Sequence, residues 1–248
     1  MEHRIFKKIE QSSNPDFGDI ISKSFDMYKK VISEGILHML ISIAIAIPFM
    51  LIVYLPILPE YIGMMQNMGG SYNQANVFED MAPPFLIVWV LVILVMSFVM
   101  QVLSVSVFGH FLKFLKNKDL GINDDIGGYF TIAKEHFGKI IILSLATTGI
   151  TLLATLACFL PVFYVMVPLT LITPIFIFNP ELSVADMVKA SFKLGNKYWG
   201  VLFGLFIVSG LMASLGFVAC YIGIIATAFF SYIVYYYVYK DTIGFDVD

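Results

Sequence analysis

Long apolar stretches without charged residues dominate the pattern of this chain. No Asp, Glu, Lys or Arg occurs in the blocks 81–112, 140–180 and 198–239. A helix rises about 1.5 Å per residue, so about 20 apolar residues cross a hydrocarbon core of about 30 Å. The blocks are longer than the helices buried in soluble proteins, and they therefore predict an integral membrane protein.

The same blocks predict six transmembrane helices. The blocks 140–180 and 198–239 are each about twice as long as one span needs. Pro161 lies at the centre of the first, where a proline removes a helix hydrogen bond and clashes with the preceding turn. Each block is therefore expected to hold two spans joined by a tight turn. The predicted spans are 35–58, 84–112, 140–160, 161–179, 198–217 and 219–239. The predicted fold is all-α, a single membrane domain over residues 1–248 with its spans in three hairpins.

The positions of the basic residues predict the orientation of these spans. All 15 Lys and Arg residues fall in the N-terminal segment, in the connections after the second and fourth spans, and after the last span. The other three connections, 59–83 and the turns near 161 and 216, contain none. Cytoplasmic connections retain Lys and Arg, so both termini are expected in the cytoplasm.

A polar segment with helical periodicity precedes each pair of spans. Helices are predicted at 16–33, 123–138 and 181–197, and each begins with Asn, Pro or acidic residues, as helix N-termini prefer. Such helices lie in the membrane interface or extend the spans into the cytoplasm, and the sequence leaves both interpretations open. Aligning the three segments predicts an internal triplication. Its marker positions are Ser24, Phe25, Phe130, Ser191, Phe192, Asn196 and Trp199.

The third segment and the C-terminus carry a recognisable pattern. The segment reads Ser191-Phe192-Lys193-Leu194, then Asn196 and Tyr198-Trp199, and the chain closes with Tyr236, Tyr239 and Asp241. This pattern resembles uncharacterised bacterial six-helix membrane proteins related to the membrane domain fused to some glycerophosphodiester phosphodiesterases. The phosphodiesterase domain itself has no counterpart in the chain. The resemblance implies a six-helix fold and a bacterial inner (plasma) membrane location, but no activity.

Catalytic and metal-binding motifs are not found in the sequence. The four His residues have neither i, i+4 nor H-x-E spacing, so they are interpreted as interfacial side chains rather than metal ligands. Cys158 and Cys220 fall near predicted outer turns, where a disulfide is geometrically possible, although two buried thiols are the commoner arrangement. The scattered lysines fit topology signals and anionic lipid contacts rather than a nucleic-acid surface. We expect no enzyme activity, no cofactor and no metal.

Polar residues at helical spacing mark two of the predicted spans. A stripe of hydroxyl groups follows one face of the third span, and the second span carries an amide near its middle. One interpretation is a polar path for a solute through the bundle. The other is close helix packing, with hydroxyls bonded to carbonyls of their own helix, and this interpretation predicts no void beside them. The candidate path consists of Ser97, Gln101, Ser104, Ser144, Thr148, Thr151 and Thr155.

The leading functional hypothesis is a non-enzymatic scaffold, assembly factor or membrane subunit of a larger system. The alternative is a transporter or channel subunit with a polar path between the second, third and fourth spans. Pro168 and Pro174 predict a kinked fourth span, and broken helices often build transporter sites. A membrane-embedded enzyme ranks third. The expected partners are membrane lipids, together with other membrane proteins or further copies of the chain.

Overall fold

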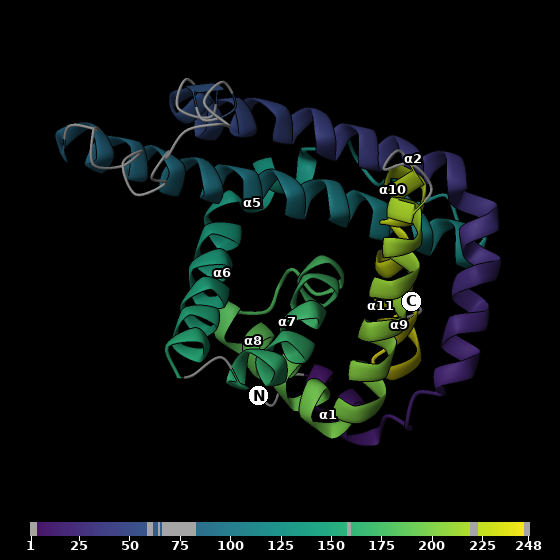
Figure 1. Cartoon of the computed structure of the whole chain (residues 1–248). Helices are drawn as coiled ribbons and strands as arrows, with labels where there is room; N and C mark the ends of the chain where they lie inside the picture. Colours follow the sequence, from purple (N-terminus) through teal and green to yellow (C-terminus); the bar gives the residue numbers. More distant parts are fainter. Residues whose placement is uncertain are drawn as a thin grey trace.

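The protein is described by a computed structural model that covers residues 4–58, 62–63, 65, 83–157, 160–218 and 223–245. Every regular element in these ranges is a helix, as predicted, and Figure 1 shows their arrangement. The elements are α1 (Arg4–Gln11), α2 (Phe17–Tyr54), the short 3-10 helix η1 (Leu55–Ile57), α5 (Pro83–Leu120), α6 (Thr131–Leu156), α7 (Leu160–Phe178), α8 (Val184–Lys197), α9 (Trp199–Val218), α10 (Gly223–Thr227) and α11 (Phe230–Thr242).

Five helices are long and apolar enough to cross a membrane: α2, α5, α6, α7 and α9. This number is compatible with a multi-pass membrane protein. The predicted sixth span, 219–239, corresponds in the described residues to α10 and α11, which a turn at 228–229 separates. Neither piece has the length of a span, so the predicted set of six spans is not confirmed.

Helix α2 joins the first polar segment and the first predicted span into one helix. Asp16 caps it, because its side chain accepts a hydrogen bond of 2.7 Å from the backbone N–H of Asp19. The helix then continues past residue 33 to Tyr54, so this segment extends the span rather than forming a separate helix. Figure 1 shows α2 changing direction along its length. Its first part packs on α11, with the Phe25 and Phe230 rings 4.9 Å apart, and its second part packs on α5.

The predicted helix at 123–138 is wrong in its first half. Residues 122–128 have no helical structure, and α6 begins only at Thr131. Gly127 adopts a positive φ of 70°, which a helix does not allow, and the Asp125 side chain accepts a hydrogen bond from its N–H. Phe130 therefore precedes α6, whereas Phe25 lies inside α2. The alignment behind the triplication is not reproduced in the middle segment.

The third polar segment forms α8, which begins later than predicted. Its N-cap is Ser183, whose hydroxyl accepts a hydrogen bond from the N–H of Asp186. Ser191 in α8 and its aligned partner Ser24 in α2 are both fully buried. The first and third segments are thus similar in structure at this position, and the triplication as a whole stays a prediction.

Helix α9 runs antiparallel to the two consecutive helices α10 and α11. These three helices are called the α9–α11 pair. The Thr227 hydroxyl donates to the carbonyl oxygen of Ala213 at 2.7 Å, and the Ser231 hydroxyl donates to that of Ser209 at 3.3 Å. These two contacts fix the register of the pair. The beginning of α9 therefore lies at the same end of the pair as the last residues of α11.

Helix α7 lies across that end of the pair. Near its beginning, the carbonyl oxygen of Tyr164 accepts a hydrogen bond from Trp199 Nε1, which opens α9. Just beyond its end, Asn179 Nδ2 donates to the hydroxyl of Tyr239 at 2.8 Å, near the end of α11. Both ends of α7 thus contact the same end of the α9–α11 pair. The expected set of three antiparallel hairpins, with 161–179 crossing beside its neighbours, is therefore not confirmed.

Polar contacts hold the N-terminal helix α1 against α8. Ile5 and Ile9 are buried, and the Lys197 ammonium donates to the carbonyl oxygens of Ile9, Glu10 and Ser12 at 2.7 to 2.9 Å. Lysine at the end of a helix satisfies carbonyls that lack a partner. Glu10 pairs with Lys193, which lowers the pKa of the Glu10 carboxyl.

Candidate functional site

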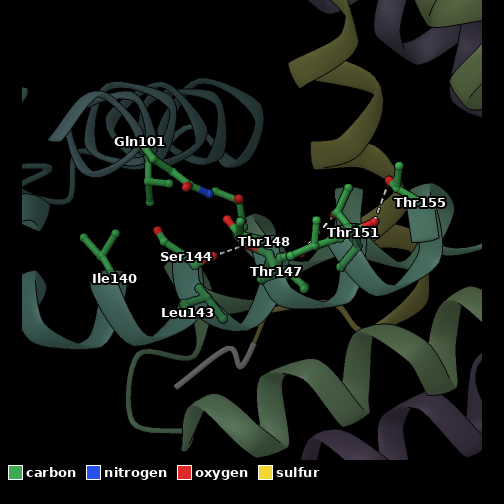
Figure 2. Close-up of a pocket in the computed structure, with 13 residues that line it drawn as sticks. Gln101, Ile140, Leu143, Ser144, Thr147, Thr148, Thr151 and Thr155 are labelled. Carbon is green, nitrogen blue, oxygen red and sulfur yellow. Dashed lines mark hydrogen bonds between the residues drawn. The ribbon is translucent and has the colours of Figure 1, made fainter. Parts of the chain in front are cut away.

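The hydroxyl stripe of α6 faces an open cavity of about 530 Å³ between α5, α6 and α7, in which Thr148 and Thr151 are exposed. Figure 2 shows its lining side chains. Thirteen residues line it: Gln101, Val105, Ile140, Leu143, Ser144, Thr147, Thr148, Thr151, Leu152, Thr155, Leu169, Ile172 and Thr173. The packing interpretation predicted no void beside the stripe, and for α6 that prediction is wrong.

Five residues of the candidate path are brought together here, and two are not. Gln101, Ser144, Thr148, Thr151 and Thr155 line the cavity. The serines of α5 at 97 and 104 are exposed and lie outside the lining. The reason is the direction of α5: only the face that carries residues 101 and 105 points between α6 and α7.

Two further threonines line the cavity and were missing from the predicted path. Thr147 lies three residues after Ser144, at the spacing that keeps a side chain near the same helix face. Thr173 comes from α7, between Pro168 and Pro174. The two prolines were recognised in the sequence as a kink, and the structure places Leu169, Ile172 and Thr173 at the cavity wall.

Three threonine hydroxyls of the stripe donate to carbonyls of their own helix. Thr147 bonds to Ser144, Thr151 to Thr147 and Thr155 to Thr151, at 2.8 to 3.0 Å. The second part of the packing interpretation, bonds within the helix, is therefore confirmed for Thr151 and Thr155 of the predicted stripe. A hydroxyl that donates its proton keeps lone pairs that accept another hydrogen bond. These threonines therefore offer acceptors to whatever occupies the cavity.

Gln101 is the one amide among the described residues of the lining. Figure 2 shows it extending from α5 toward the face of α6 that carries Thr148. An amide both donates and accepts hydrogen bonds, so it complements the acceptors of the threonines. Among the described residues of the lining there is no charged side chain, His or Cys. These residues therefore offer hydrogen-bond donors and acceptors without a formal charge.

Two of the histidines meet away from this cavity. His38 of α2 and His110 of α5 are both buried, with Nε2 of the first 2.8 Å from Nδ1 of the second. His38 Nδ1 lies 2.7 Å from the carbonyl oxygen of Glu34, and the Tyr129 ring packs on both imidazoles. The prediction that these two histidines are interfacial side chains is wrong. Spacing along the chain gave no signal, because the residues are 72 positions apart and only the α2–α5 contact joins them.

The other candidate ligands do not extend this pair. His136 lies at a kink inside α6 and packs on Phe176. Within the described ranges, no group of three or more His, Cys, Asp or Glu side chains is placed to hold a metal ion. His3, Cys158 and Cys220 lie outside the described residues, so the predicted alternatives for the two cysteines stay open.

The residues that carry the family resemblance lie at helix contacts. Asn196 accepts a hydrogen bond of 2.6 Å from the Tyr164 hydroxyl, and Tyr239 bonds to Asn179. Asp241 forms an ion pair with Lys23 at 3.1 Å. These side chains thus join α7, α8, α11 and α2, which is a structural role. Comparison with protein-family models, curated proteins and solved structures found no match to the chain, so the resemblance rests on these sequence segments alone.

Proposed function

We propose that the protein is a transporter or channel subunit that binds a small neutral polar solute in the cavity between α5, α6 and α7. One observation carries this proposal: five residues that the sequence marks as a candidate path line one cavity together with α7. Polar groups in apolar surroundings cost free energy unless they find hydrogen-bond partners. A solute or water in the cavity supplies those partners.

The chemistry of the lining selects a class of solute. Threonine oxygens accept hydrogen bonds, and the Gln101 amide both donates and accepts. A polyol, an amide or another uncharged molecule with several donors satisfies this set. An ion would enter without a countercharge in the lining, and burying an unpaired charge is costly. Neutral solutes are therefore favoured over ions.

A second candidate is the scaffold, assembly factor or membrane subunit that the sequence suggests. Its support is the apolar surface of the α2–α5 pair, on which Ile87 and Val95 are each more than 60% exposed. Such a surface suits lipids, other membrane proteins or a second copy of the chain. We propose no enzyme activity for either candidate.

For the orientation, we propose that both termini lie in the cytoplasm of a bacterial cell, with the chain in the inner membrane. Basic residues support this, and so do contacts between the two ends: Lys8 Nζ lies 3.5 Å from the carbonyl oxygen of Gly244. Cysteines introduced at Ser71 and Lys189 test it in intact spheroplasts. An impermeant thiol reagent should label position 71 and spare 189. The reverse pattern would invert the topology.

Solute flux into liposomes that contain the purified protein tests the function. We expect polyols to enter faster than into protein-free liposomes. Gln101→Leu and Thr173→Val should slow entry about fivefold each, the equivalent of one lost hydrogen bond of about 1 kcal/mol. Thr170→Val is the matched control, because Thr170 lies on the same helix, donates to Val167 and does not line the cavity. Entry no faster than in protein-free liposomes, or equal effects at 170 and 173, would refute the proposal.

A further inference from the structure

A second and apolar groove lies beside the polar cavity, between α5 and the first part of α6. Its volume is about 800 Å³. Nine of its ten lining side chains are apolar, and the tenth is a lysine: Val95, Phe98, Val99, Val102, Leu103, Phe130, Ala133, Lys134, Phe137 and Ile141. Val95 and Phe137 are 62% and 56% exposed, so the groove opens to the surroundings of the helices. In a membrane protein those surroundings are lipid.

Lys134 lines the groove and differs from two neighbouring lysines, Lys116 and Lys139, in its partners. Lys116 pairs with Asp124, and Lys139 donates to the carbonyl oxygens of Pro180 and Leu182. Within the part of the chain that the structure describes, the exposed ammonium of Lys134 forms neither an ion pair nor a hydrogen bond. Glu135, the next residue, points about 100° further round the helix and does not line the groove.

The position of Lys134 in α6 adds a second indication. It lies in the first turn of the helix, where the helix dipole disfavours a cation. The N–H groups of Thr131, Ala133 and Lys134 are already bonded, that of Ala133 to the Ser106 hydroxyl of α5 at 3.0 Å. An anionic group bound beside Lys134 would therefore act on the lysine itself, by neutralising its charge at the positive end of the dipole.

We propose that this groove binds an anionic phospholipid, with one acyl chain along the apolar lining and the headgroup phosphate on Lys134. An acyl chain fits because the lining is apolar along both helices. The single cation, Lys134, lies at the end of the groove where α6 begins. By the distribution of basic residues this end faces the cytoplasmic leaflet, where a lysine near the surface attracts anionic lipid. The site does not depend on which solute enters the polar cavity.

Fluorescence quenching by brominated lipids tests this site in the full chain reconstituted into vesicles. Trp89 and Trp199 are first replaced by Phe, and Phe137→Trp then places one reporter in the groove. Vesicles contain a small fraction of brominated phosphatidylglycerol or of brominated phosphatidylcholine. We expect the anionic lipid to quench at about fivefold lower mole fraction, the effect of one lysine near the surface. Lys134→Gln should remove this preference, because the acyl chain still binds but the phosphate loses its partner.

Two controls make the outcome decisive. Lys118→Gln removes an exposed lysine at the end of α5, outside the groove, and should leave the preference unchanged. Phe163→Trp reports from an exposed position on α7 and should show equal quenching by both lipids. Equal quenching at position 137, or a preference that survives Lys134→Gln, would overturn the proposal. Quenching at 137 by neither lipid would also overturn it, since the groove would then be covered by protein, such as a second copy of the chain.

Discussion

Hydroxyl-bearing residues have opposite roles in α6 and in the α9–α11 pair. In α6, Thr151 donates to its own helix and faces a cavity. In the pair, Thr227 donates to the carbonyl of Ala213 on the facing helix at 2.7 Å. Both threonines belong to apolar helices. The residue type therefore does not decide between packing and cavity.

The residues around the hydroxyl decide whether it bonds to a facing helix or lines a cavity. Gly216 faces the backbone of Gly223, and an added Cβ would lie 2.3 Å from its carbonyl carbon. Such close approach brings a carbonyl of one helix within reach of a short side chain on the other. The Thr151 hydroxyl of α6 instead faces the cavity, beside Leu152, which is 57% exposed. A hydroxyl on this face of α6 does not reach the next helix, and it bonds to a carbonyl of its own helix.

The largest expected effect comes from adding a methyl group at Gly216, where α9 closely approaches α10. Gly216→Ala should destabilise the protein by about 2 kcal/mol or more, because the new methyl group meets backbone atoms of Gly223 and the Thr227 hydroxyl within 2.5 Å. The measurement is thermal or denaturant unfolding of the purified protein in detergent. Overpacking against backbone is costly because neither helix can move aside without losing the contact.

Two matched glycines sharpen this test. A Cβ added at Gly210 in α9 or at Gly149 in α6 meets nothing within 4 Å. Alanine at either position should therefore be neutral or stabilise by up to about 1 kcal/mol, since alanine favours a helix over glycine. If Gly216→Ala and Gly210→Ala lowered the free energy of unfolding equally, α9 and α10 would not be in close backbone contact at Gly216.

Hydropathy was sufficient to predict the class of the fold and much of the helix pattern. The charge-free blocks place α7 and α9 close to their predicted bounds, because length and apolar composition are local properties. Helices α2, α5 and α6 include most of the predicted apolar stretches but extend beyond them into the flanking polar segments. The path of α7 across the end of the α9–α11 pair was not predictable. It depends on contacts of Tyr164 and Asn179 with residues far along the chain, such as Trp199 and Tyr239.

The candidate site was predictable in part for the same reason. Helical spacing identified Ser144, Thr148, Thr151 and Thr155 as one face of one helix. Whether that face meets a helix or a cavity depends on where α5 and α7 lie, and contacts between residues far apart in the chain determine that. The His38–His110 contact likewise joins two helices through residues that share no local pattern.

The smallest expected effect compares the two threonines directly. Thr227→Val removes a hydrogen bond between helices and should cost about 1 kcal/mol, in line with the modest value of such bonds inside membranes. Thr151→Val has nearly the same volume but removes only a bond within α6, so its stability should change by a few tenths of a kcal/mol. Unfolding of both variants, with polyol flux measured in parallel, separates the two roles. Thr151→Val should slow flux while leaving stability unchanged, and Thr227→Val should do the opposite. If both variants lost stability equally, the α6 stripe would be a packing surface and the cavity beside it would have no role in binding.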